Sequence, residues 1–210
     1  MNGSSSASKQ PSLYHVATAP HLWGCFLFIN SVYFVETAYN SGMDVFSHGL
    51  WGGVAFGRRS RHDFYLAILF GMLPDLLSFG IFTPIRIASI VSGQRTGDLW
   101  STNTIPTYVH TLYSITHSLV VFIALLGILY LFARRFAVPF LAYGLHILVD
   151  IPTHSDLFFP TPFLWPLSNF TVNGIPWGEP IIYLPNIILL TAAYVWWWSS
   201  EEKSHNHPMT

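Results

Sequence analysis

Five ionisable side chains within apolar stretches of this sequence are of the types that bind divalent metals: His48, Asp75, His117, His146 and Asp150. An aspartate at the centre of a membrane-spanning helix costs roughly 2.5 to 3.5 kcal/mol on insertion scales, so each of these residues needs a partner. His146 and Asp150 are four residues apart, which places both on one helical face and within reach of one ion. Imidazoles and carboxylates without thiolates favour zinc, with manganese or another divalent ion as alternatives.

Two further residues extend this set beyond the His146/Asp150 pair. His154 and Asp156 follow Asp150 by four and six residues, and we expect them to act as a further ligand, a general base or an outer partner of the ligands. Simpler interpretations exist, because a lone membrane histidine more often packs through a hydrogen bond, and Asp75 or Asp150 could cap a helix end. The occurrence of all these residues together favours a metal site.

The composition predicts a membrane protein. The chain has 210 residues, of which 51% are hydrophobic and only 9% are charged, whereas soluble domains contain roughly 25% charged residues. The mean hydropathy is +0.44. Nine basic against ten acidic residues argue against nucleic-acid binding. Cys25 is the single cysteine, which excludes an intrachain disulfide.

The apolar stretches predict an all-α fold, a multipass transmembrane bundle of about five to six apolar helices, one of them short and glycine-rich. The expected segments are a marginal anchor at 21–39, the glycine-rich helix from residue 43, and spans at 64–82, 111–133, 136–150 and 180–198. Residues 83–110 are expected to form a polar connection. Residues 151–179 are rich in Pro, Phe and Trp, which suits a loop at the membrane interface.

The basic residues predict the orientation, because Lys and Arg in short loops are retained in the cytoplasm. If the 58–63 turn is cytoplasmic, seven basic residues fall inside and two, Arg86 and Arg95, fall outside. The seven are Lys9, Arg58, Arg59, Arg61, Arg134, Arg135 and Lys203. This orientation brings the five candidate ligands to the outer face of the membrane, although only basic residues were used to derive it.

The segments around these ligands also resemble a known family. They are Ser47-His48-Gly49, Leu73-Pro74-Asp75, Ile115-Thr116-His117-Ser118-Leu119 and Gly144-Leu145-His146-Ile147-Leu148-Val149-Asp150, followed by Phe163-Leu164-Trp165-Pro166-Leu167. From residue 43 to about 198, the chain resembles the LexA-regulated, membrane-bound metal-dependent hydrolases of bacteria and archaea. The resemblance implies a metal site made of His48, Asp75, His117, His146 and Asp150. The order of these residues is distantly similar to the zinc-dependent phospholipase C and single-strand nuclease superfamily, which implies phosphoester cleavage.

Two positions depart from the family pattern. The family's P-D-x-D motif reads Pro74-Asp75-Leu76-Leu77, without the second Asp, and its frequent H-R-G-x-T-H motif reads Leu112-Tyr113-Ser114-Ile115-Thr116-His117. These departures leave open the number of metal ions and the presence of a basic substrate-binding residue.

Together, the residues and the resemblance predict a metal-dependent hydrolase in the bacterial inner membrane. It would cleave a phosphoester, on a lipid or lipid-linked substrate, with a water activated by the metal and with Asp75, Asp150 or Asp156 as proton acceptor. We expect a tail and anchor at 1–42, which is either lineage-specific or an over-extended gene start, a hydrolase-like domain at 43–198 and a polar tail at 199–210. The alternatives are a non-catalytic protein that binds or transports divalent cations, and a structural membrane protein with an inert cluster.

Overall fold

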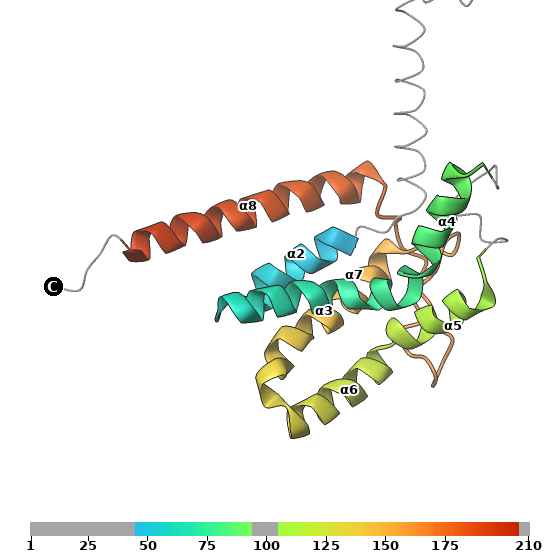
Figure 1. Ribbon diagram of the computed structural model, residues 1–210, viewed down its shortest axis with the longest axis horizontal. Helices are drawn as coiled ribbons and strands as arrows, with labels where there is room; N and C mark the ends of the chain where they lie inside the picture. Colours follow the sequence, from blue (N-terminus) through green and yellow to red (C-terminus); the bar gives the residue numbers. More distant parts are fainter. Residues whose placement is uncertain (1–44, 94–104, 206–210) are drawn as a thin grey trace, which may run out of the picture. The chain divides into compact units, whose positions relative to one another are not determined.

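The computed structural model describes residues 45–93 and 105–205, and this part of the chain is helical and forms no strand. The expected all-α fold is therefore confirmed, while the predicted tail and anchor at 1–42 lie outside the described residues. The helices are α2 (Val45–Phe56), α3 (Arg61–Phe79), α4 (Phe82–Val91), α5 (Thr107–Thr116), α6 (Leu119–Phe132), α7 (Ala137–Thr153) and α8 (Pro180–His205), with a 3₁₀ turn at Arg134–Phe136 (Figure 1).

Two of these helical segments are long and apolar enough to cross a membrane by themselves, Arg134–Thr153 and Pro180–Trp197. Two further pairs qualify only when both members are counted as one span: α3 with α4, bent by 60°, and α5 with α6, bent by 57°. The described residues thus contain two to four candidate spans. The prediction of five to six apolar helices is not confirmed.

The bend between α5 and α6 interrupts the span that was predicted at 111–133. His117 follows the last residue of α5, and the Ser118 side chain accepts a hydrogen bond from the Val121 N–H at 3.2 Å. A serine in this position satisfies an orphan N–H group of the next helix and so fixes its first turn. Consequently His117 lies in a break between two helices, and the expected continuous span is divided between the end of α5 and α6.

The polar connection predicted at 83–110 is partly helical as well. Nearly all of α4 and the first residues of α5 fall within this range. One apolar cluster holds them against α3 and the loop that follows α7, which explains why a segment of moderate hydropathy is helical here. The cluster consists of Phe79, Phe82, Ile105, Val109, Tyr113 and Phe159.

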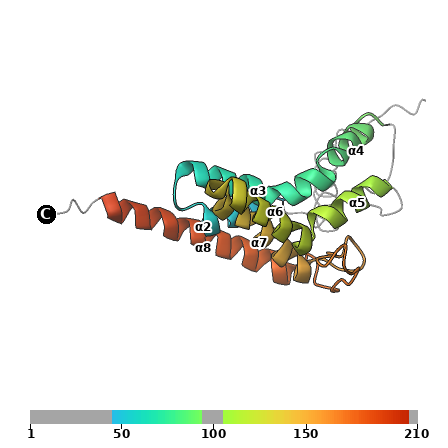
Figure 2. The ribbon, with the colours of Figure 1, turned by 90° about the horizontal axis from the view of Figure 1, so that it is seen from below.

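Helices α2, α3 and α7 pack against one another and carry four of the five candidate ligands (Figures 1 and 2). The short turn at 57–60 joins α2 to α3, so these two helices run antiparallel. The His62 and Phe136 rings lie 6.5 Å apart at the starts of α3 and α7, so these two helices run parallel. At Gly71 a Cβ atom would lie 2.6 Å from the His48 carbonyl oxygen. The close contact of α2 with α3 therefore requires glycine at this position.

Helix α8 is attached to α2 by a polar contact. The Asn186 side chain accepts a hydrogen bond from Trp51 Nε1 at 2.8 Å and donates one to Ser47 Oγ at 2.9 Å. Only 11% of the apolar window Pro180–Trp197 is buried. An apolar helix that buries so little of its surface against protein is suited to contact with lipid.

Candidate metal centre

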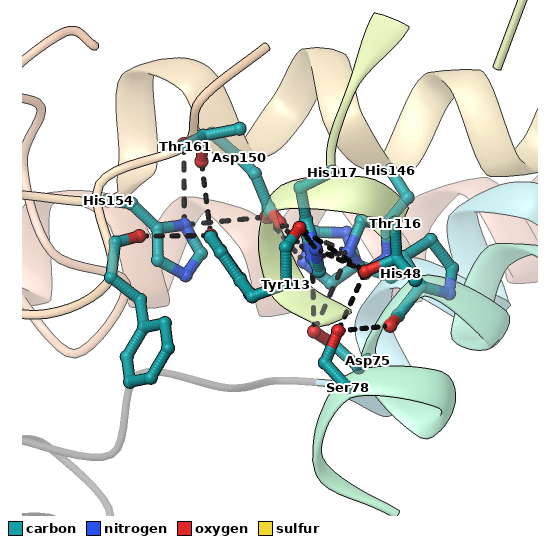
Figure 3. Close-up of polar contacts among 12 residues, drawn as sticks. His48, Asp75, Ser78, Tyr113, Thr116, His117, His146, Asp150, His154 and Thr161 are labelled. Carbon is teal, nitrogen blue, oxygen red and sulfur yellow. Dashed lines mark hydrogen bonds and ion pairs between the residues drawn. The ribbon is translucent and has the colours of Figure 1, made fainter. Parts of the chain in front are cut away.

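The structure brings the five predicted ligands together from separate elements (Figure 3). His48 comes from the first turn of α2, Asp75 from the second half of α3, His117 from the α5–α6 break, and His146 and Asp150 from α7. All five residues are buried, with at most 4% of their surface exposed. Metal binding by these residues stays a prediction, and the distances between their donor atoms show which of them could share an ion.

Asp150 lies at the centre of this cluster. Its Oδ1 atom is 3.0 Å from His48 Nε2, and its Oδ2 atom is 3.1 Å from His146 Nε2 and 3.3 Å from His117 Nε2. Despite these short distances, neither carboxylate oxygen has a hydrogen-bond partner in the described part of the chain. Buried anionic oxygens that accept no hydrogen bond need a positively charged partner.

Five distances among four of the donor atoms resemble those between the ligands of one ion. His117 Nε2 lies 3.1 Å from His146 Nε2, and Asp75 Oδ1 lies 3.4 and 3.7 Å from these two nitrogens. Asp150 Oδ2 is similarly close to both. Ligands bound tetrahedrally to zinc at about 2.0 to 2.1 Å lie about 3.3 Å from one another. The observed distances scatter around this value.

The donors also form two overlapping groups. Asp75, His117 and His146 are one group of three ligand atoms that lie within 4.8 Å of one another, and His48, His146 and Asp150 are the second. His146 belongs to both groups. The arrangement can therefore accommodate one ion or a pair of neighbouring ions.

Hydrogen bonds fix which nitrogen of His146 carries the proton. Its Nδ1 atom lies 2.7 Å from the Gly71 carbonyl oxygen. A carbonyl can only accept, so Nδ1 carries a proton, and Nε2 presents a lone pair when the ring is neutral. Metal-binding histidines are commonly oriented by such a bond from the second ring nitrogen to a backbone carbonyl.

His117 is oriented in the same way by a chain of hydroxyl groups. Ser78 Oγ donates to the Pro74 carbonyl at 2.9 Å, so at 2.7 Å it accepts from Thr116 Oγ1. Thr116 Oγ1 in turn accepts from His117 Nδ1 at 3.0 Å, and the Tyr113 carbonyl lies 3.2 Å from the same nitrogen. In a neutral ring, His117 Nε2 therefore also presents a lone pair.

The consequence is an electrostatic imbalance that a cation would remove. Two lone-pair nitrogens lie 3.1 Å apart, and the carboxylates of Asp75 and Asp150 contact both of them. With neutral imidazoles the cluster carries two negative charges, which one divalent ion would neutralise. Buried charges are otherwise paired or coordinate metals.

His154 lies at the edge of the cluster and outside both ligand groups. Its Nδ1 atom is 3.3 Å from the Asp150 carbonyl oxygen and 3.6 Å from Asp150 Oδ1. Burial lowers the pKa of His154, although the Asp150 carboxylate acts in the opposite direction. In Figure 3 its ring is separate from the other three imidazoles.

Asp156 is not brought to the cluster. Asp156 is exposed, and its backbone N–H donates to Asn173 Oδ1 at 3.0 Å. The reason is that α7 ends at Thr153, so the helical spacing that links His146 to Asp150 does not continue to Asp156. The structure therefore gives no support to Asp156 as a ligand or proton acceptor.

The expected loop at 151–179 covers the cluster after the last turn of α7. Gly174 N–H donates to the His154 carbonyl at 2.7 Å, and Leu119 N–H donates to the Phe163 carbonyl at 2.9 Å. At Gly174 a Cβ atom would lie 2.2 Å from the Pro152 carbonyl oxygen, so only glycine allows this close approach. The loop is thus fastened to the helices that carry the ligands.

Several residues that shape the centre were not identified from the sequence. Gly71, Ser78 and Thr116 orient the imidazoles, and Trp177 contacts His48 edge-on, with ring centroids 5.1 Å apart. Trp177 is 5% exposed, and within the described chain its Nε1 atom has no hydrogen-bond partner. No local pattern marks these residues, because each acts through a contact with a segment distant in sequence.

The ligands and the arginines lie at opposite ends of the helices. Asp75 follows Arg61 by 14 residues in α3, which is about 21 Å along a helix axis. Asp150 follows the 3₁₀ turn at Arg134–Phe136 by a similar length of α7. This arrangement agrees with the orientation predicted from basic residues, while the side of the membrane stays a prediction.

Comparison with known proteins places the chain in a family. No curated protein and no solved structure matches it significantly. A family model described as YdjM inner membrane protein matches residues 43–207. That description and the apolar helices confirm a membrane protein, but the description names no LexA regulation, hydrolase activity or phospholipase C relationship, so these remain predictions. Because the match covers most of its length, the chain belongs to the YdjM inner membrane protein family.

Proposed function

We propose that this inner membrane protein is a metal-dependent hydrolase that cleaves a phosphoester, with zinc as the favoured ion. One observation carries the proposal: His117 Nε2 and His146 Nε2 lie 3.1 Å apart beside two buried carboxylates, while the Nδ1 atom of each ring donates to a protein oxygen. Neutral rings in this arrangement repel each other unless a cation lies between them. The resemblance to metal-dependent hydrolases supports the step from metal binding to hydrolysis.

The roles of the residues follow from their contacts. Asp75, His117 and His146 would hold an ion, with Asp150 Oδ2 beside two of them. His48 would bind together with His146 and Asp150, whose Oδ1 atom lies 3.0 Å from His48 Nε2. A divalent ion bound there would supply Lewis-acid chemistry, lowering the pKa of a water and neutralising charge on phosphoryl oxygens. Asp75 and Asp150 are the proposed proton acceptors.

The packing below the cluster favours this proposal over cation transport. A transporter needs polar groups that continue from its site toward the other membrane face. In the described residues, α6 and α7 contact each other through an apolar cluster, and α3 side chains pack against this cluster. It offers no such polar continuation. Its buried members are Phe122, Phe140, Tyr143 and Ile147, with Phe70 and Leu73 packed on them.

We further propose that the centre faces the extracytoplasmic side and acts on a lipid or lipid-linked phosphoester. Its distance from the arginine turns and the lipid-exposed surface of α8 support this placement. In a Cys25→Ser background, a membrane-impermeant thiol reagent should label His110→Cys and spare His62→Cys in intact cells. Labelling of position 62 alone would reverse the orientation.

Metal content and hydrolysis, measured on the same preparations, test the function. Detergent-purified wild type should contain at least one equivalent of zinc and cleave a phosphodiester probe such as bis-p-nitrophenyl phosphate. The double variant His117→Ala, His146→Ala should lose both properties. The matched control His62→Ala, His110→Ala removes two exposed imidazoles and should retain them.

The outcomes separate the alternatives. Folded wild type that binds no zinc or manganese after resupply would contradict a metal centre and favour an inert cluster. Metal bound by the predicted residues without cleavage of phosphomonoester, phosphodiester or phospholipid probes would contradict the hydrolase and favour cation binding. Transmembrane metal flux in proteoliposomes, lost in the double variant, would show the transport alternative.

A further inference from the structure

We propose that a second, basic pocket, at the opposite end of α3 from the metal centre, binds the phosphate of an anionic lipid headgroup. The turn at 57–61, the first turns of α3 and the end of α8 line this pocket, whose volume is about 540 Å³. Small-ligand sites generally occupy about 300 to 1,000 Å³. The proposal is independent of the hydrolase function, because no candidate metal ligand lines the pocket.

The residues that line the pocket carry positive charge. Arg58, Arg59 and Arg61 line it, and all three residues are exposed. Among the side chains that the structure describes, which exclude those of residues 201–205, no carboxylate forms an ion pair with any of these arginines, and Asp63 instead faces His62 at 3.9 Å. Planar guanidinium groups bind phosphate oxygens through paired hydrogen bonds. An anionic phosphate is therefore the ligand that this charge favours.

Arg58 is already positioned by an aromatic ring, while the other two arginines are available. The Arg58 guanidinium lies 4.6 Å from the centroid of the Trp196 ring, a cation–π contact. Arg59 and Arg61 form no comparable contact in the described chain. Helix α3 begins at Arg61, so the positive end of a long helix dipole adds to the field in the pocket.

The pocket walls are aromatic and are held in place without a ligand. Phe64 of α3 contacts Trp197 of α8 edge-on, with ring centroids 5.1 Å apart, and Tyr194 stacks on Trp197 at 5.9 Å. The Tyr194 hydroxyl donates to the Leu50 carbonyl at 3.1 Å. These contacts join α8 to α2 and α3, so the pocket is preformed.

The position of the pocket along α8 favours a lipid over a soluble anion. The apolar window of α8 ends at Trp197, which itself lines the pocket. Trp and Tyr concentrate at the depth of lipid headgroups, and basic pockets between membrane helices bind anionic headgroups. Tyr65, also a lining residue, is 68% exposed and extends the aromatic surface outward. The phosphate available at this depth belongs to lipid.

Titration of the purified full chain tests the proposal. Short-chain phosphatidylglycerol, short-chain phosphatidylcholine and inorganic phosphate are each added below micelle-forming concentrations, and binding is followed by tryptophan fluorescence. The test variant is Arg59→Gln, Arg61→Gln. The matched control is Arg134→Gln, Arg135→Gln, which removes the same charge from exposed arginines at the same end of the helices but outside the pocket.

We expect wild type and the control to bind phosphatidylglycerol more tightly than either other probe. The test variant should bind it at least about tenfold more weakly, since charge-assisted hydrogen bonds are lost. Equal weakening in both double variants would overturn the proposal in favour of general surface charge. Inorganic phosphate that binds as tightly as phosphatidylglycerol would identify a soluble anion and overturn the lipid assignment.

The thermal midpoint without added lipid reports whether each variant is folded. If the double variant fails this control, the single variant Arg59→Gln provides the comparison, and wild-type affinity in it would likewise contradict the pocket.

Discussion

The substitution Asp150→Asn distinguishes a metal centre from a set of buried ion pairs. The Asp150 oxygens lie 3.0 to 3.3 Å from three imidazole nitrogens. If these rings were protonated, loss of the carboxylate would leave buried positive charge unpaired and cost about 3 to 5 kcal/mol of unfolding free energy. The proposed metal centre instead requires neutral rings, and the Nδ1 hydrogen bonds of His117 and His146 leave both Nε2 atoms to face the cluster. We therefore expect the metal-free variant to lose far less stability than this.

The stabilisation that added zinc gives should then be much smaller in Asp150→Asn than in wild type, because the variant has lost a ligand. Free zinc at about 100 times its Kd stabilises a protein by about 2.7 kcal/mol, which for a chain of this size raises the thermal midpoint by about 5 to 11 °C. Loss even of an outer partner weakens metal binding by about 10- to 100-fold. With a 100-fold loss, the same zinc concentration stabilises Asp150→Asn by only about 0.4 kcal/mol, a shift of about 1 to 2 °C.

The assay is thermal unfolding in detergent, with and without zinc after treatment with a chelator. Asp156→Asn is the matched control, because it makes the same chemical change at an exposed position outside the cluster, and it should respond to zinc like wild type. A metal-free Asp150→Asn protein destabilised by about 3 to 5 kcal/mol, together with a wild type that zinc does not stabilise, would refute the assignment of neutral ligands.

Three further predictions concern the residues around the ligands. Gly71→Ala should destabilise the protein by about 1 to 3 kcal/mol in thermal unfolding because a Cβ there meets backbone, whereas Gly127→Ala, where nothing lies within 4 Å, should not. Thr116→Val should weaken zinc binding about tenfold in a competition titration through loss of the acceptor for a ligand ring, and Ser114→Ala, on the same helix, should leave the affinity unchanged. Trp177→Phe should retain zinc but lower phosphodiester turnover about tenfold if its unpartnered N–H donates to a substrate oxygen; unchanged turnover would exclude that role.

The convergence of the five ligands was predictable because it depends on local spacing and on helix direction. The i, i+4 spacing of His146 and Asp150 survives in α7, and the arginine turns indicated which ends of the helices share a side. Antiparallel α2 and α3 then bring His48 and Asp75 to the same end. Such relations need only the sequence and the geometry of a helix.

The breaks within the predicted spans were not predictable, because they depend on distant contacts. Hydropathy is continuous from 111 to 133, yet the helix stops before His117. Leu119 N–H donates to the Phe163 carbonyl, and the Ser118 hydroxyl donates to the Trp165 carbonyl. Both acceptors lie more than forty positions later in the sequence. The break gives His117 the freedom to direct its ring into the cluster.

The two departures from the motifs of the hydrolase family that the sequence resembles have different consequences for the site. Leu77 occupies the position of the family's second Asp, and it is 51% exposed, while Asp75 is buried in the cluster. A carboxylate at position 77 would therefore point away from the donors, and its absence removes no ligand.

Tyr113 occupies the position of the Arg in the second motif. Its ring stacks on His117 at 3.8 Å, and its hydroxyl donates to the Phe159 carbonyl. A neutral aromatic thus replaces a basic residue beside the centre. We accordingly expect metal binding to be retained and the recognition of the substrate phosphate to fall to other donors, of which Trp177 is the one with an unpartnered N–H in the described chain.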